Sequence, residues 1–132
     1  MRGIHAILAG LAVTGCMTQP PPATRSADAQ AKFQRLTANK VPGRPITCLP
    51  SYRTNDMVRI DNSTVAFRQG RRVYVNHLLG ECSGLRSDFY ALVTRTSGPG
   101  LCRGDIARVQ DLQTGAIVGS CAIGDFVPYA SR

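Results

Sequence analysis

The positions of four cysteines constrain the fold of this chain more than any other feature of its sequence. They are Cys48, Cys82, Cys102 and Cys121, in a chain of 132 residues. An even number of cysteines in a short exported domain predicts disulfide bonds, and four cysteines can form two bonds in three different pairings. A structural zinc site would need closely spaced cysteine pairs or several histidines, and this region contains only His77. We therefore expect two disulfides and no metal ion.

The N-terminus indicates that the chain is exported. Arg2 is followed by an apolar stretch over residues 4–13, and the small residues Thr14 and Gly15 precede Cys16. This pattern is typical of a secretory signal peptide. The sequence Val-Thr-Gly-Cys resembles the lipobox of bacterial lipoproteins, which implies cleavage before Cys16 and acylation of that cysteine. The alternative is an ordinary signal peptide or short membrane helix with a chance cysteine, but the stretch is far shorter than the roughly 20 residues that span a bilayer.

The segment after Cys16 has the composition of a tether. Residues 20–22 are prolines, which favour an extended chain. Good helix formers follow Ser26, a suitable N-cap, and they include Phe33 and Leu36. We expect a disordered or partly helical tether that contributes little to the core; the alternative is that Phe33 and Leu36 pack onto the domain. The expected organisation is a signal peptide at residues 1–15, a lipidated tether at 16–40 and a disulfide-stapled β-domain at 41–132.

The net charge of +8 at pH 7 is concentrated close to the expected anchor. Residues 17–47 contain five basic side chains and one acid, Asp28. Basic side chains near a membrane surface attract anionic lipid by about 1 kcal/mol per charge. An exported, anchored protein does not meet nucleic acid, so we expect its partners to be the membrane and an envelope protein or acidic envelope component. The residue after Cys16 is Met17 and not Asp. By resemblance to lipoprotein sorting in enteric bacteria, this implies that the protein is located at the outer membrane and faces the periplasm.

Short alternating segments after residue 46 predict an all-β domain. Residues 58–60, 65–67 and 73–75 alternate apolar with other side chains and are separated by turn residues, which favours an antiparallel meander. Residues 105–111 and 116–121 predict a second hairpin. We expect five to six strands in a small antiparallel β-barrel or curled meander. In this arrangement the core would contain Val58, Ile60, Val65, Phe67, Val73 and Val75, whereas Arg59, Arg68 and Tyr74 would point outward.

The expected disulfide pairing follows from the segments that lack strand patterns. Cys82 and Cys102 flank an irregular region that contains a Ser-Gly-Pro-Gly loop at residues 97–100. A bond between them would hold this region in place. Cys48 would then pair with Cys121 and close a long loop, which stabilises most in the chain-entropy model. The other two pairings remain open at this point.

Residues 41–129 resemble an uncharacterised family of small proteobacterial lipoproteins and exported proteins that share a domain of unknown function. The resemblance rests on residues 42–49 (Pro-Gly-Arg-Pro-Ile-Thr-Cys-Leu), 64–67 (Thr-Val-Ala-Phe), 101–106 (Leu-Cys-Arg-Gly-Asp-Ile) and 121–129 (Cys-Ala-Ile-Gly-Asp-Phe-Val-Pro-Tyr). It implies a fold and an envelope location, and no reaction.

Motifs that carry chemistry are sparse. The Gly-Glu-Cys-Ser-Gly sequence at residues 80–84 has the outline of a nucleophile elbow, but the helix and the α/β fold that this device requires are missing from the pattern. The Arg-Gly-Asp sequence at residues 103–105 spells an adhesion motif and more simply forms a turn. A possible binding site for an acidic partner combines Arg68, Arg71 and Arg72 with Tyr74. We expect a non-enzymatic interaction module with no cofactor and no catalytic residues; the alternative is a small periplasmic ligand-binding or inhibitor domain.

Overall fold

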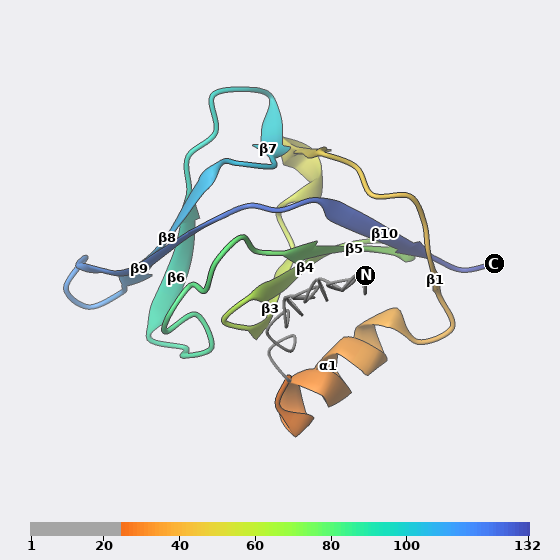
Figure 1. Cartoon of the computed structure of the whole chain (residues 1–132), viewed down its shortest axis with the longest axis horizontal. Helices are drawn as coiled ribbons and strands as arrows, with labels where there is room; N and C mark the ends of the chain where they lie inside the picture. The colour runs from red at the N-terminus through yellow and green to blue at the C-terminus, as the bar shows by residue number, and fades with distance from the viewer. Residues whose placement is uncertain (1–24) are drawn as a thin grey trace, which may run out of the picture.

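Ten β-strands and one α-helix follow one another along residues 25–132, the part of the chain that the computed structural model describes (Figure 1). The elements are α1 (Ala27–Thr37), β1 (Val41–Pro42), β2 (Cys48–Pro50), a 3₁₀ turn η1 (Ser51–Arg53), β3 (Met57–Asp61), β4 (Thr64–Gln69), β5 (Arg72–His77), β6 (Tyr90–Thr94), β7 (Gly100–Cys102), β8 (Ile106–Asp111), β9 (Ile117–Ala122) and β10 (Phe126–Ala130). Within these residues no helix is long and apolar enough to cross a membrane.

The strands form three antiparallel sheets. The largest has the order β1-β10-β5-β4-β3, β2 pairs with β7, and the third sheet has the order β6-β8-β9. The predicted β class is therefore confirmed. The predicted barrel is wrong for residues 25–132, because none of these sheets closes on itself. The chain changes sheet several times between β1 and β10, so strands that follow one another in the chain often lie in different sheets.

The strands β3, β4 and β5 pair in chain order, and local turn chemistry explains why. The carboxylate of Asp61 accepts a hydrogen bond from the backbone N–H of Ser63 at 2.8 Å, which turns the chain from β3 into β4. Gly70, with a φ of +56°, occupies the tight turn between β4 and β5. At the far side of the molecule, the N–H groups of Thr114 and Gln113 donate to Asp111 and lower its pKa while they shape the β8–β9 turn.

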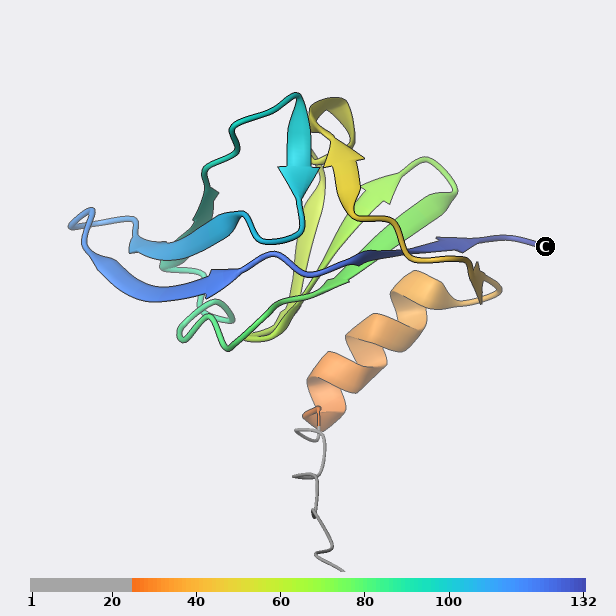
Figure 2. The same cartoon turned by 45° about the horizontal axis from the view of Figure 1, so that its top comes forward.

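Both faces of the five-stranded sheet are buried. One face packs against the other two sheets, and this main core contains Val65, Phe67 and Tyr74 together with Leu49, Leu85, Leu101, Val109, Ile123 and Phe126. The opposite face contains Ile60, Ala66, Val73 and Val75, and α1 covers it with Ala29, Phe33 and Leu36. Figure 2 shows α1 on one side of this sheet and the β2–β7 ribbon on the other.

This two-sided burial corrects the predicted orientation of several side chains. Phe67 lies opposite Tyr74 in the register of β4 and β5, and Ala66 lies opposite Val75. Residues directly opposite in a sheet share a face, so Tyr74 points into the main core beside Phe67 and is only 2% exposed. Val73 and Val75 point the other way, toward α1. The expected outward position of Tyr74 is therefore wrong.

The helix α1 belongs to the segment that the sequence indicated as tether. The side chain of Ser26 accepts a hydrogen bond from the N–H of Ala29 and caps the helix, as expected. Phe33 packs edge-on against Tyr129 with ring centroids 6.0 Å apart, and the guanidinium of Arg25 lies 4.5 Å from the Phe33 ring centroid. The alternative arrangement, in which Phe33 and Leu36 pack onto the domain, is the one that the structure has.

Candidate functional site

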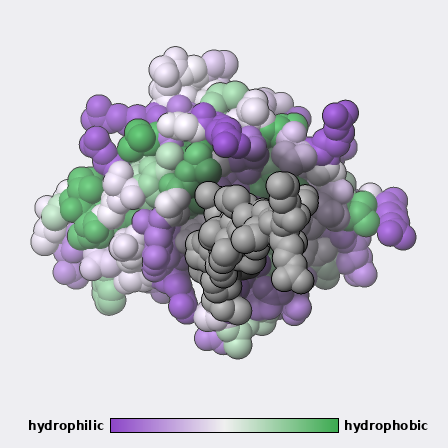
Figure 3. All heavy atoms as spheres, in the orientation of Figure 1, coloured by the Kyte–Doolittle hydropathy of each residue, from purple (hydrophilic) through white to green (hydrophobic). Residues whose placement is uncertain are grey.

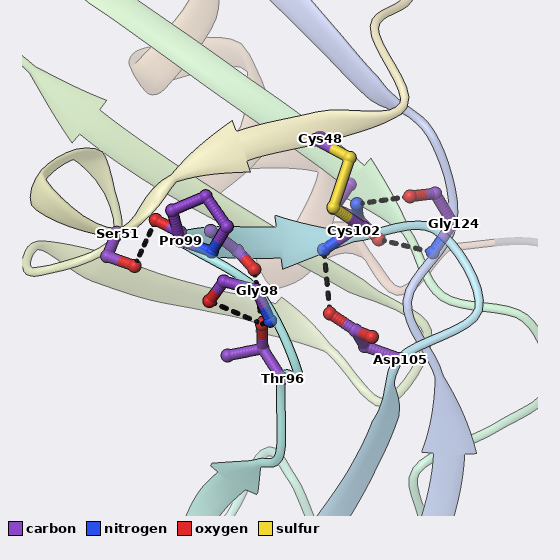
Figure 4. Close-up of a disulfide and its surroundings, with 10 residues drawn as sticks. Cys48, Ser51, Thr96, Gly98, Pro99, Cys102, Asp105 and Gly124 are labelled. Carbon is purple, nitrogen blue, oxygen red and sulfur yellow. Dashed lines mark hydrogen bonds between the residues drawn. A yellow bond between two sulfur atoms is a disulfide. The ribbon is translucent and has the colours of Figure 1, made fainter.

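All four cysteines of the domain are in disulfides, but the predicted pairing is wrong. The bonds are Cys48–Cys102 and Cys82–Cys121. Cys48 and Cys102 lie directly opposite each other in β2 and β7, with 4.0 Å between their Cα atoms (Figure 4). Pairing of β2 with β7 is a long-range contact, so the positions along the chain did not reveal it. The predicted lipidation site, Cys16, lies outside the described residues.

The region around Cys102 also shows what the Arg-Gly-Asp sequence does. The carboxylate of Asp105 accepts a hydrogen bond from the backbone N–H of Cys102 at 2.8 Å, as Figure 4 shows. Arg103 forms an ion pair with Asp125 at 2.5 Å. Both charged side chains of the motif are therefore used within the fold, as expected of a structural turn.

The arginine cluster that the sequence suggested is divided by the fold. Arg71 and Arg72 lie exposed at the β4–β5 turn. Arg68 makes two hydrogen bonds to Asp56, at 2.9 and 3.0 Å, and this carboxylate raises the pKa of the guanidinium. Tyr74 instead lies in the core, where its hydroxyl accepts a hydrogen bond of 2.7 Å from the guanidinium of Arg53. Tyr74 thus lies apart from the exposed arginines of the turn.

A groove of about 900 Å³ lies where the start of α1 meets the ends of β3, β4 and β5. Arg25 crosses it and contacts Asp61 at 3.1 Å and the hydroxyl of Thr64 at 3.4 Å. His77 also lines the groove, and partial burial together with the charge of Arg25 lowers its pKa. The other lining residues are polar or charged by type, apart from Leu78, although they expose much of their aliphatic surface to the groove. Such a groove offers hydrogen bonds and charges of both signs to a small polar molecule.

The outer face of the β6-β8-β9 sheet is a second candidate site, and it was not among the sites expected from the sequence. Ala107 and Val109 point into the core from β8, so Ile106, Arg108 and Gln110 point outward. Val93, Ile106 and Ile117 are 40%, 49% and 51% exposed on this sheet. Figure 3 shows hydrophobic side chains gathered on the side of the molecule where Figure 1 places β8 and β9.

Charged side chains surround these aliphatic groups. Arg95, Arg108 and Asp105 line a shallow hollow of about 450 Å³ together with Val93, Ile106, Ile117, Gly104 and Gln110. Neither Arg95 nor Arg108 forms an ion pair with another residue in the 25–132 range. The sequence contained one signal for this site: Ile106 and Arg108 are two residues apart in a predicted strand, so an aliphatic and a basic side chain share one face. We call this set of residues the outer face below.

Metal-ligating and nucleophilic side chains are the remaining candidates within residues 25–132. Among residues 25–132, no three His, Cys, Asp or Glu side chains come together as a possible metal site. The cysteine of the Gly-Glu-Cys-Ser-Gly sequence, Cys82, is buried and disulfide-bonded. It therefore has no free thiol to act as a nucleophile.

Comparison of the chain with protein-family models, with curated proteins and with solved structures gives no match.

Proposed function

We propose that this protein is a lipid-anchored component of the bacterial cell envelope, and that its folded part is a non-enzymatic module that binds another envelope component. The anchor proposal rests on the lipobox-like sequence that ends at Cys16. Met17, where an Asp after the acylated cysteine would retain the protein in the inner membrane of enteric bacteria, supports an outer-membrane location that faces the periplasm. The two disulfides agree with an oxidising compartment such as the periplasm.

The observation that carries the binding proposal is the outer face. Exposed aliphatic side chains that lie together and are surrounded by charges mark interaction sites on many soluble proteins. Two arginines without ion pairs in the described structure give this face a preference for negatively charged partners.

Substitution at the anchor tests the first half of the proposal. Stable anchoring requires more than one acyl chain, at about 0.8 kcal/mol per buried CH₂ group. Cys16→Ser should abolish labelling by a palmitate analogue and release the protein from membranes. Labelling of the variant at the level of the original chain would refute the lipobox assignment.

Substitutions on the outer face test the second half. Ile106→Asp and Ile117→Asp should reduce the envelope components that are crosslinked to the protein in intact cells. Leu112→Asp is the matched control, because Leu112 is 64% exposed on the turn of the same hairpin but does not line the hollow. Equal crosslinking in the original chain and in all three single-substitution variants would contradict a binding role for this face.

A small periplasmic ligand-binding or inhibitor domain is a second candidate, and the groove beside His77 favours it. The groove of about 900 Å³ has the size of a small-molecule site. The groove is open to solvent and would enclose only part of a ligand, which makes it less suited to tight binding. Arg86→Glu, at the rim of the groove, should weaken binding of small anions if this function is the correct one.

A further inference from the structure

Most sheet edges in the described part of the chain are protected against pairing with another strand. The edge strand β3 contains a register shift between Arg59 and Asp61 and contacts α1, and β1 has only two residues, one of them Pro42. Along β9, the backbone of Ser83 lies against Gly119, so closely that a Cβ there would be 2.7 Å from the Ser83 oxygen. Bulges, prolines and covering loops are the usual means by which proteins prevent edge-to-edge association.

The edge strand β6 has none of these features. It has five residues, Tyr-Ala-Leu-Val-Thr, without a charge, a proline or a glycine. Its residues pair with β8 in a continuous register from Tyr90 opposite Asp111 to Thr94 opposite Ala107. It is the longest regular edge in residues 25–132 that lacks a bulge, a proline or a covering segment.

The hydrogen bonds beside β6 show which backbone groups are available. Leu112 donates to the carbonyl of Phe89 at 3.0 Å, and Arg95 donates to the carbonyl of Ile106 at 3.3 Å. Because antiparallel pairs alternate, Ala91 and Val93 between them also turn their backbone groups toward β8. The N–H and C=O groups of Leu92 and Thr94 then point away from the sheet, and no other described residue bonds to them.

The opposite end of this edge is closed by a side chain. The guanidinium of Arg59 donates to the carbonyl of Ser87 at 2.8 Å and to the carbonyl of Tyr90 at 2.9 Å. Arg59 thus binds the outward-facing carbonyl of Tyr90, the first residue of β6. The backbone groups of Leu92 and Thr94 stay available for another strand. A strand that pairs here would place alternate side chains beside Val93 and Arg95 on the outer face.

We propose that β6 accepts an extended segment of a partner protein by strand addition. The segment has aliphatic and acidic side chains in alternation along the side that covers the outer face: the aliphatic groups contact Val93, and the carboxylates pair with Arg95 and Arg108. Asp105 lines the same hollow, but its carboxylate accepts a hydrogen bond from the N–H of Cys102. The hollow therefore has two guanidinium groups and one carboxylate, and its net charge is positive. The inference rests on the proposed binding function and names the partner for that same face.

The charge distribution disfavours two other partners for the β6 edge, a second copy of this chain and an anionic membrane. A second copy of the chain would bring the same arginines to the contact, and the whole chain carries a net charge of +8. An anionic membrane would satisfy the arginines, but Asp88 and Asp111 lie at the end of the sheet where two highly exposed apolar side chains, Phe89 and Leu112, would insert.

A synthetic peptide tests the proposal on the purified full chain. The probe is a peptide that repeats the sequence Val-Thr-Glu-Thr, so that valine and glutamate alternate along one side of the strand and threonine lies along the other. Hydrogen–deuterium exchange measured by mass spectrometry should slow in residues 90–95 when the peptide is added, while residues 64–69 stay unchanged. A peptide with lysine for glutamate, and a peptide with N-methylated backbone amides, should give no protection.

Charge reversal provides the matched comparison. Arg95→Glu with Arg108→Glu should weaken peptide binding roughly tenfold or more. Arg71→Glu with Arg72→Glu changes the net charge equally at an exposed turn away from β6, and should leave the affinity unchanged.

Four outcomes would overturn the strand proposal: no protection of residues 90–95 by the glutamate peptide, equal binding of the N-methylated peptide, protection by anionic phosphatidylglycerol vesicles in place of the peptide, and protection that rises with protein concentration alone. If one of them is found while Ile106→Asp and Ile117→Asp still reduce crosslinking in cells, the strand proposal fails and the proposed binding function stands.

Discussion

Asn76 is the residue on which the junction between β5 and β10 depends most directly. It is fully buried, its side-chain amide donates to the carbonyl of Gly124 at 2.8 Å, and its side-chain oxygen accepts from the N–H of Gly124 at 3.0 Å. One side chain thus satisfies both backbone groups of a buried glycine. Asn76→Ala should lower the free energy of unfolding by about 2–4 kcal/mol, because it leaves both groups without partners. Urea denaturation measures this loss, with Gln113→Ala at an exposed turn as a control; a loss no greater than that of the control would contradict it.

At the same scale, His77 gives the protein a predictable response to pH. Partial burial and the charge of Arg25 lower its pKa, so the unfolded chain takes up a proton at a higher pH than the folded protein. The free energy of unfolding should therefore fall as the pH drops through about 6.5 and should level off below the folded pKa. The effect is modest, because the imidazole stays open to solvent on one side. Denaturation between pH 8 and 5 should show a smaller slope for His77→Gln; an identical slope would mean that the histidine does not contribute.

At the scale of elements, the two disulfides are placed very differently. Cys82 is fully buried and Cys121 is 8% exposed in the main core, whereas Cys48 lies at the surface on the β2–β7 ribbon. Loops of 54 and 39 residues predict about 4 kcal/mol of stabilisation from each bond in the chain-entropy model. Mild reduction followed by alkylation should label Cys48 and Cys102 first, because a reductant reaches an exposed bond more readily. Mass spectrometry of the labelled peptides decides this, and earlier labelling of Cys82 and Cys121 would contradict it.

For the whole molecule, the question is whether α1 belongs to the folding unit. Phe33 and Leu36 cover the face of the five-stranded sheet that contains Val73 and Val75. Full burial of a side chain of this size contributes roughly 1.5–3 kcal/mol. Phe33 and Leu36 are partly buried and each contribute less, but deletion also removes buried Ala29 and exposes the sheet face beneath the helix. A loss of ~1 kcal/mol shifts the melting temperature of a domain this size by 4–8 °C. Deletion of residues 25–40 should therefore lower the melting temperature by more than about ten degrees. Gln34→Ala, on the exposed side of the helix, is the control. A shift of only a few degrees after the deletion would mean that the helix is not part of the folding unit and that the domain begins at residue 41, as the sequence predicted.

The sequence alone determined the features that depend on neighbouring residues. The turns after Asp61 and at Gly70, the strands β3 to β5 and the N-cap at Ser26 all follow from local hydrogen bonds and glycine geometry, and each was predicted. The number of disulfides also followed, because it depends on composition and the expected compartment.

Only the tertiary structure decided what depends on long-range contacts. The disulfide partner of Cys48 is fixed by the pairing of β2 with β7, two segments 54 residues apart in the chain. Tyr74 is buried because both faces of its sheet are covered, and an alternating pattern does not reveal a second cover. The outer face exists because the short third sheet has no layer beyond it, so the exposure of Val93 and Ile117 follows from how sheets stack and not from their own sequence.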